Sequence, residues 1–165
     1  MLKIYKLGDE ILHKKASMVP DFDQTLRDLV EAMFETMHQG DGIGLAAPQV
    51  GVLKRVFISN VTGDEPRVFI NPEILRTSIE QSTYEEGCLS IPEIYADILR
   101  PSAVTIQAWN ERGKPFRFDA EGLLARVILH ENDHLNGILF IDRVNAKKRK
   151  RLVKLYDRKV KNGCA

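Results

Sequence analysis

The sequence lacks the features that mark membrane, secreted and disordered proteins. Its two cysteines, Cys88 and Cys164, are too few for a disulfide framework and are typical of a reducing compartment. No apolar run reaches the roughly 18 residues that span a bilayer, and the first residues contain no apolar core of a signal peptide. There is no internal repeat and no low-complexity or linker-like stretch. We therefore expect one cytoplasmic domain over residues 1–165, without membrane contact.

The chain also has almost no net charge, with 24 basic and 23 acidic side chains, but the two signs are separated along it. Residues 146–165 hold nine basic side chains and one acidic side chain, which leaves 15 basic and 22 acidic side chains in the rest. A basic terminal segment on an acidic body favours an acidic partner for that segment.

Three segments have the apolar spacing of amphipathic helices. Residues 24–39 repeat apolar side chains every three or four positions, with Asp23 as the N-cap and Gly40 as the stop. A second helix is predicted from about Asp119 to about Asn136. A third is predicted over residues 146–161 and carries most of the basic side chains.

Between these helices the sequence predicts short strands separated by turn signals. Residues 55–59 and 67–70 flank a Gly63-Asp64 turn, and Asn71-Pro72 ends the second run. Residues 103–109 and 116–118 flank a turn at 110–113, which predicts a hairpin. Because no helix separates these strands, we expect mostly antiparallel pairing. The expected fold class is α+β, with mixed or antiparallel sheets around a central helix and with N-terminal and C-terminal helices.

The segment His130-Glu131-Asn132-Asp133-His134 points to metal chemistry. On a helix, side chains at positions i and i+4 lie on one face, so His130 and His134 can bind one ion. The glutamate after the first histidine can then act as general base toward an activated water. The sequence predicts His130 and His134 as metal ligands and Glu131 as the base.

A hydrolytic metal needs a third protein ligand, and Cys88 is the best candidate. The remaining histidines, His13 and His38, sit among lysines or in a predicted helix and look like ordinary surface positions. A lone cysteine is more often a small buried apolar residue, but the incomplete ligand set reverses that preference. One thiolate and two imidazoles suit Zn²⁺, Fe²⁺, Ni²⁺ or Co²⁺.

Three segments together resemble the signature motifs of the peptide deformylase family, in the family's order and near its usual spacing. They are Gly42-Ile43-Gly44-Leu45-Ala46-Ala47-Pro48-Gln49, Glu86-Gly87-Cys88-Leu89-Ser90 and His130-Glu131-Asn132-Asp133-His134. The resemblance spans essentially the whole chain. The sequence departs from common family patterns at Glu10, Tyr95 and Leu129, none of which is a predicted ligand or the base.

The resemblance implies a function, a metal and further site residues. It implies removal of the N-formyl group from the formylmethionine of nascent polypeptides, with Fe²⁺ as the native ion. It further implies that Gln49 and the backbone N–H of Leu89 stabilise the oxyanion. We expect the backbones of Ile43 and Gly44 to bind an extended peptide. Apolar lining of a methionine pocket is expected from Ile43, Leu123 and Val127. For Leu123 and Val127, which share the helical face of His130, the alternative is plain core packing.

Two other functions remain open from the sequence. A zinc-dependent peptidase also uses H-E-x-x-H, but a downstream third ligand would then be expected. An RNA-binding or ribosome-binding module is suggested by the basic helix, although such helices are often only solvated surface. We favour a combination in which residues 147–161 bind the ribosome and the body deformylates emerging chains. We expect a monomer, and we assign no role to Cys164.

Overall fold

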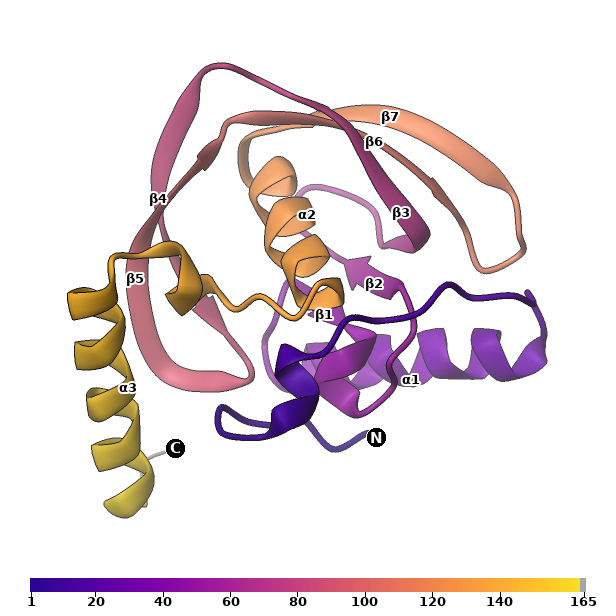
Figure 1. The fold of residues 1–165 in the computed structure, drawn as a ribbon. Coiled ribbons are helices and arrows are strands. Elements are labelled where there is room, and N and C mark those ends of the chain that lie inside the picture. The colour runs from indigo at the N-terminus through magenta and orange to yellow at the C-terminus, as the bar shows by residue number, and fades with distance from the viewer. Residues whose placement is uncertain (164–165) are drawn as a thin grey trace.

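Two antiparallel sheets surround one central helix in the computed structural model, which describes residues 1–163 (Figure 1). Cys164 lies outside the described residues. One sheet has the strand order β1-β2-β3-β6-β7, formed by Gly44–Ala46, Val56–Ser59, Arg67–Thr77, Ala103–Trp109 and Pro115–Glu121. The second pairs β4 (Gln81–Cys88) with β5 (Ile91–Pro101). The expected α+β class is confirmed.

The three long helices are α1 (Gln24–Gln39), α2 (Gly122–Leu135) and α3 (Ala146–Lys161). Short 3₁₀ turns lie at Glu10–His13 (η1), Ala47–Val50 (η2) and Phe140–Arg143 (η3). The Asp23 side chain accepts the Leu26 N–H at the start of α1, as the sequence predicts. The predicted start of the second helix is wrong, because Asp119 belongs to β7, which pairs with β6 as far as Glu121.

The predicted end of a strand at Asn71-Pro72 is also wrong, since β3 continues to Thr77. A register shift between Ile70 and Glu73 accommodates the proline, which has no N–H to donate. Asn71 adopts a φ of 50°, and its side chain bonds both the N–H and the carbonyl of Val19 at 2.8 and 3.0 Å. These two bonds hold the bulge in place.

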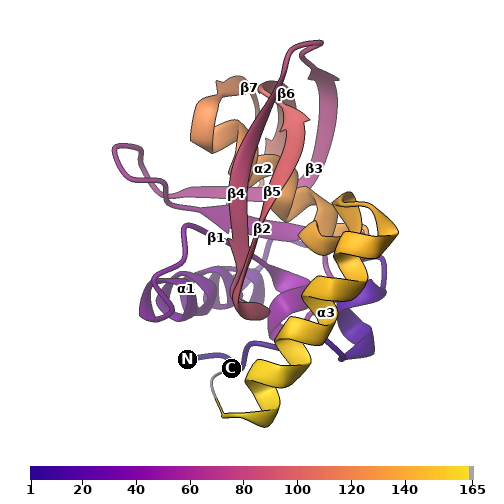
Figure 2. The same ribbon diagram turned by 90° about the vertical axis from the view of Figure 1, so that its left-hand side faces the viewer.

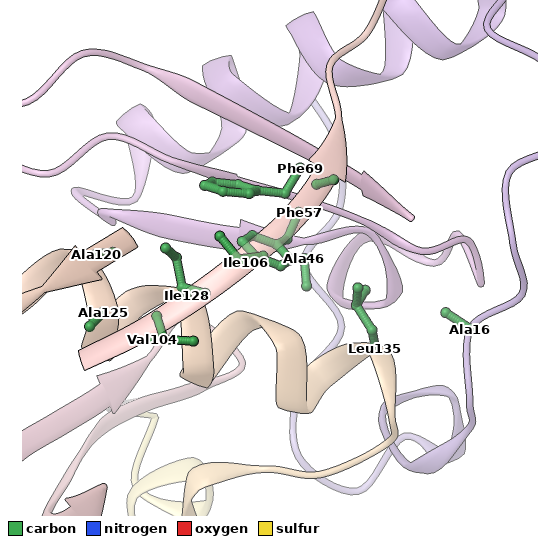
Figure 3. Packing of buried hydrophobic residues seen from close by; sticks show 11 residues of the cluster. Ala16, Ala46, Phe57, Phe69, Val104, Ile106, Ala120, Ala125, Ile128 and Leu135 are labelled. Carbon is green, nitrogen blue, oxygen red and sulfur yellow. The ribbon is translucent and has the colours of Figure 1, made fainter. Parts of the chain in front are cut away.

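The buried face of α2 packs on the five-stranded sheet (Figure 3). Ala125, Ile128 and Leu135 of α2 meet a layer that includes Phe57 and Phe69, whose rings stack 4.6 Å apart. A second core joins the other part of this sheet to α1. Because the apolar contacts fix one face of α2, the opposite face, which bears His130 and His134, is turned toward the β4–β5 hairpin.

The basic helix α3 lies along β5 at one side of the molecule (Figure 2). Leu152 and Tyr156 are its buried anchors, and they join a third core with residues of the hairpin and η3. Most of its lysines and arginines are exposed. Among residues 1–163, no helix has the length and apolar character needed to cross a membrane.

Candidate metal centre and active-site cleft

A cleft of about 570 Å³ lies between β1, the β4–β5 hairpin and α2. Nine of the ten site residues predicted from the sequence line it. The tenth, His134, lies behind the lining and contacts Cys88. The predicted residues on the lining are Ile43, Gly44, Gln49, Cys88, Leu89, Leu123, Val127, His130 and Glu131. Segments far apart in the sequence therefore meet at one place.

The donor atoms of Cys88, His130 and His134 all lie within 4.8 Å of one another. Cys88 Sγ is 3.4 Å from His134 Nε2. Metal–sulfur and metal–nitrogen bonds at a tetrahedral angle place such atoms about 3.5 Å apart, so this set fits a small divalent ion. Burial lowers the pKa of His134 well below its usual value, which keeps its imidazole neutral. A neutral imidazole is the form that binds metal.

His130 is oriented by the buried carboxylate of Glu86. Its Nδ1 lies 2.8 Å from Glu86 Oε1. Since a carboxylate only accepts, Nδ1 carries a proton, which leaves Nε2 as the ring nitrogen that can bind a metal. Burial raises the pKa of Glu86, but hydrogen bonds from His130 and Arg100 outweigh burial and lower it to about 2. Glu86 is therefore ionised at neutral pH.

The surroundings of His130 favour positive charge. Burial alone lowers the pKa of His130, but the charge of Glu131 and the hydrogen bonds to Cys88 and Glu86 raise it well above its usual value. A divalent ion placed among the three donors meets the same negative surroundings. Donor type, spacing and charge all fit a metal at this position.

Glu131 is 4% exposed, and its Oε2 lies 3.9 Å from His130 Nε2. Burial raises the pKa of Glu131 to about 7, close to the value that suits a general base at neutral pH. Its Oε1 is buried and accepts no hydrogen bond from residues 1–163. Gly44 allows this close packing, because a Cβ there would lie 2.6 Å from Glu131 Oε2.

Gln49 is held with its amide nitrogen toward the ligand cluster. Its Oε1 accepts the Ala46 N–H at 3.0 Å, which fixes the amide orientation. Its Nε2 donates to Cys88 Sγ at 3.3 Å and to Ser90 Oγ at 3.0 Å. Leu89 follows Cys88 in the turn between β4 and β5 and lines the cleft. Both residues thus lie beside the donor set.

The strand β1 is an edge strand of the five-stranded sheet, and it borders the cleft. The Ile43 carbonyl accepts the Asn60 N–H at 2.9 Å and so is used within the sheet. Because successive residues of a strand point their backbone groups in opposite directions, those of Gly44 face the open edge. Leu123 and Val127 form an apolar wall on α2, and Val127 is 5% exposed.

Sequence reasoning missed a buried ionic network behind the cluster. Arg100 donates to both oxygens of Glu86, at 2.7 and 3.0 Å, and to Asp133 at 2.8 Å. Arg126 donates to Glu86 at 2.8 Å. A signal was present in the sequence, because Arg100 continues the alternation of buried Ile94, Ala96 and Ile98 along β5. A cation at a predicted core position indicates a buried acidic partner.

Comparisons with known proteins find peptide deformylases. A family model described as polypeptide deformylase matches residues 1–150. A peptide deformylase of Clostridium botulinum is 55% identical over 144 residues, which is 87% of this chain and 97% of that protein. The crystal structure of a peptide deformylase from Legionella pneumophila superposes with a TM-score of 0.94 at 41% identity, covering 99% and 97% of the two chains. A Synechococcus elongatus peptide deformylase, solved in complex with actinonin, gives a TM-score of 0.90 at 44% identity, covering 94% and 86%.

Proposed function

The chain belongs to the peptide deformylase family, and we propose that its cleft hydrolyses the N-formyl group of formylmethionyl peptides and releases formate. The observation that carries this proposal is the convergence of Cys88, His130 and His134 beside a buried carboxylate. Enzymes of this family are metal-dependent. We propose that these three residues hold the ion.

We propose Fe²⁺ as the native ion, with Zn²⁺, Ni²⁺ or Co²⁺ as substitutes. An ion held there supplies Lewis-acid activation of water and of the formyl oxygen. Glu131 takes the proton of the attacking water and returns it to the departing amine. Its raised pKa, about 7, suits both directions of transfer.

The chain's own donors stabilise the negative charge that forms on the formyl oxygen. Gln49 supplies its Nε2 amide and Leu89 supplies its backbone N–H. Losing one such donor costs about 3–4 kcal/mol of transition-state stabilisation. Gln49 suits this role because its amide nitrogen already faces Cys88, 3.3 Å away.

An extended peptide adds to the open edge of β1 through backbone bonds to Ile43 and Gly44. Because the Ile43 carbonyl is already bonded to Asn60, the backbone groups of Gly44 are the ones left at the open edge for substrate. The methionine side chain lies against Ile43, Leu123 and Val127. These three residues line the cleft near the base.

The assay that tests this function measures two products. Purified protein is incubated with formyl-Met-Ala and, separately, with Met-Ala. We expect formate from the first peptide and no cleavage of the peptide bond in either, and a chelator that removes the metal abolishes formate release. Peptide-bond cleavage without formate release favours the zinc-dependent peptidase instead. A zinc peptidase of that kind would use a third ligand downstream of His134. Within residues 1–163, the group of potential metal ligands consists instead of His130, His134 and the upstream Cys88.

We also propose that residues 147–161 dock the enzyme on the ribosome, in the bacterial cytoplasm. The support is the set of exposed basic side chains on α3, a helix anchored through Leu152 and Tyr156. Acidic ribosomal RNA supplies the opposite charge. A reducing compartment protects Cys88 from oxidation, and residues 1–165 act as one monomeric domain. Co-sedimentation with ribosomes that persists in high salt contradicts this docking.

A further inference from the structure

The proposed ligands come from a hairpin and from a helix that packs on the other sheet. Cys88 ends β4 in the two-stranded sheet, whereas His130 and His134 lie on α2, which packs on the five-stranded sheet (Figure 1). Among residues 1–163, β4 and β5 pair with each other and with no strand of the larger sheet. The distance from Cys88 to the imidazoles therefore depends on whatever fixes the hairpin against α2.

One side chain of α2 hydrogen-bonds to both strands of this hairpin. Arg126 Nη1 donates to the Ile98 carbonyl on β5 at 2.8 Å. Its Nη2 donates to the carbonyl and hydroxyl of Ser82 on β4, at 2.8 and 3.2 Å. Nη1 also donates to Glu86 Oε2 at 2.8 Å, and the other oxygen of Glu86 accepts from His130.

The environment of Arg126 makes these bonds costly to lose. The residue is 6% exposed, and the Tyr84 ring covers its guanidinium at 5.7 Å. Two main-chain carbonyls lose their donor if the guanidinium is removed. A lysine cannot replace the planar fork, because a single ammonium does not span both strands.

Arg100 also connects the hairpin to α2. It lies on β5 and donates to the Asp133 side chain of α2, so this connection involves one strand only and no main-chain group. Arg126 is thus the residue of the network that joins α2 to the main chain of both strands.

We propose that Arg126 is a positioning residue. Its hydrogen bonds hold the hairpin that carries Cys88 against the helix that carries His130 and His134. In this way it sets the affinity of the site for its metal. It acts through Glu86, Ser82 and Ile98 and touches none of the three ligands. The proposal rests on the metal centre proposed above.

The test is Co²⁺ binding by the purified, metal-free protein. The dissociation constant is measured by competition with a chelator, and the thiolate-to-cobalt charge-transfer band reports the bond to Cys88. We expect Arg126→Met and Arg126→Lys to bind Co²⁺ about tenfold more weakly than the wild type. We also expect a weaker charge-transfer band, because the hairpin no longer holds Cys88 in place.

Arg55→Met is the matched control. Arg55 is half-buried and bonds the other end of α2, at the Leu135 carbonyl and the Asn136 side chain, each at 3.2 Å. Among residues 1–163, its side chain makes no hydrogen bond to the hairpin, so its loss lowers stability and leaves the Co²⁺ affinity and the band unchanged.

Arg126→Met that folds and binds Co²⁺ like the wild type, with an unchanged band, overturns the proposal. So does a raised KM for formyl-Met-Ala with unchanged metal affinity, because Arg126 then only lines the cleft. If Arg126→Met does not fold, Arg126→Lys decides by the same two readouts. If the wild type binds no Co²⁺ through a thiolate, the proposed metal centre is wrong as well. The wild-type measurement therefore distinguishes an error in the metal centre from an error in the role of Arg126 alone.

Discussion

Two groups of charged side chains in this molecule are built from similar residues in opposite surroundings. Around Glu86, the side chains of Arg100, Arg126, Asp133 and His130 are all under 10% exposed, and each has an oppositely charged or hydrogen-bonding partner within 3.0 Å. On α3, lysines and arginines point into solvent, and the one ion pair made from this helix within residues 1–163 joins Arg149 to Asp142.

The difference separates two uses of charge. A buried network is costly to disturb, so it fixes positions near the cleft. Exposed charges contribute little to stability but act over a longer range, where salt screens them. We therefore propose that the first group fixes the geometry of the site and that the second serves encounter with a partner.

The largest effect is expected from Glu86→Gln, which leaves two buried arginines without their shared carboxylate. Breaking a buried ion pair in this way typically costs about 3–5 kcal/mol in the free energy of unfolding. Urea denaturation measures the loss. The control is Glu85→Gln at the exposed neighbouring position, where we expect a change within about 0.5 kcal/mol. If the two substitutions lower the free energy of unfolding equally, the buried network is no more costly to disturb than an exposed charge, against our expectation.

Gln49→Ala is expected to affect the reaction more than the fold. It removes a donor aimed at the cluster, and losses of this kind lower kcat about 10²- to 10³-fold. The formate assay measures this change alongside metal content. Gln39→Ala at the exposed end of α1 is the control. A Gln49→Ala enzyme with normal kcat removes the amide from the proposed mechanism.

Gly44→Ala tests how tightly the base is packed. The new Cβ lies 2.6 Å from Glu131 Oε2 and 2.8 Å from Val127 Cγ1, so the carboxylate has to move. A displacement of about 1 Å costs about 10²-fold in rate. We expect kcat to fall while the bound metal, measured by elemental analysis, stays the same. An unchanged kcat means that the position of Glu131 is less constrained than the structure indicates.

The smallest effect on stability is expected on α3. Replacing Lys147, Lys150, Arg151 and Lys154 together by Gln keeps the anchors Leu152 and Tyr156. Because all four side chains are exposed, each change should alter the free energy of unfolding by no more than about 0.5 kcal/mol. Ribosome co-sedimentation, in contrast, should fall and lose its salt dependence. Large destabilisation with normal ribosome binding reverses the roles of the two charge groups.

The parts of the molecule that depend on local sequence could be predicted. Asp23 and the apolar spacing after it located α1, and the spacing of His130 and His134 placed both histidines on one face of α2. The same local reasoning failed at Asn71-Pro72, because the bulge there is held by Val19, 52 residues away. A contact over such a distance leaves no trace in a short window of sequence.

The supporting residues of the site escaped prediction for the same reason. Glu86 bonds His130 over 44 positions, and Arg126 bonds Ser82 over the same separation. The β4–β5 hairpin brings these residues together. Most residues of β4 are exposed, so its sequence lacks the alternation of apolar and polar residues that predicts a strand. The proposed ligands were recognisable by their chemistry, whereas the groups that orient them became visible only in the fold.

We propose that Glu131 works as the base beside a metal held by Cys88, His130 and His134. The most direct measurement is formate release from formyl-Met-Ala by Glu131→Gln, with metal content determined on the same sample. We expect this variant to hold a full complement of metal and its kcat to fall by about 10²- to 10⁴-fold. Near-normal formate release by a metal-loaded Glu131→Gln protein contradicts it.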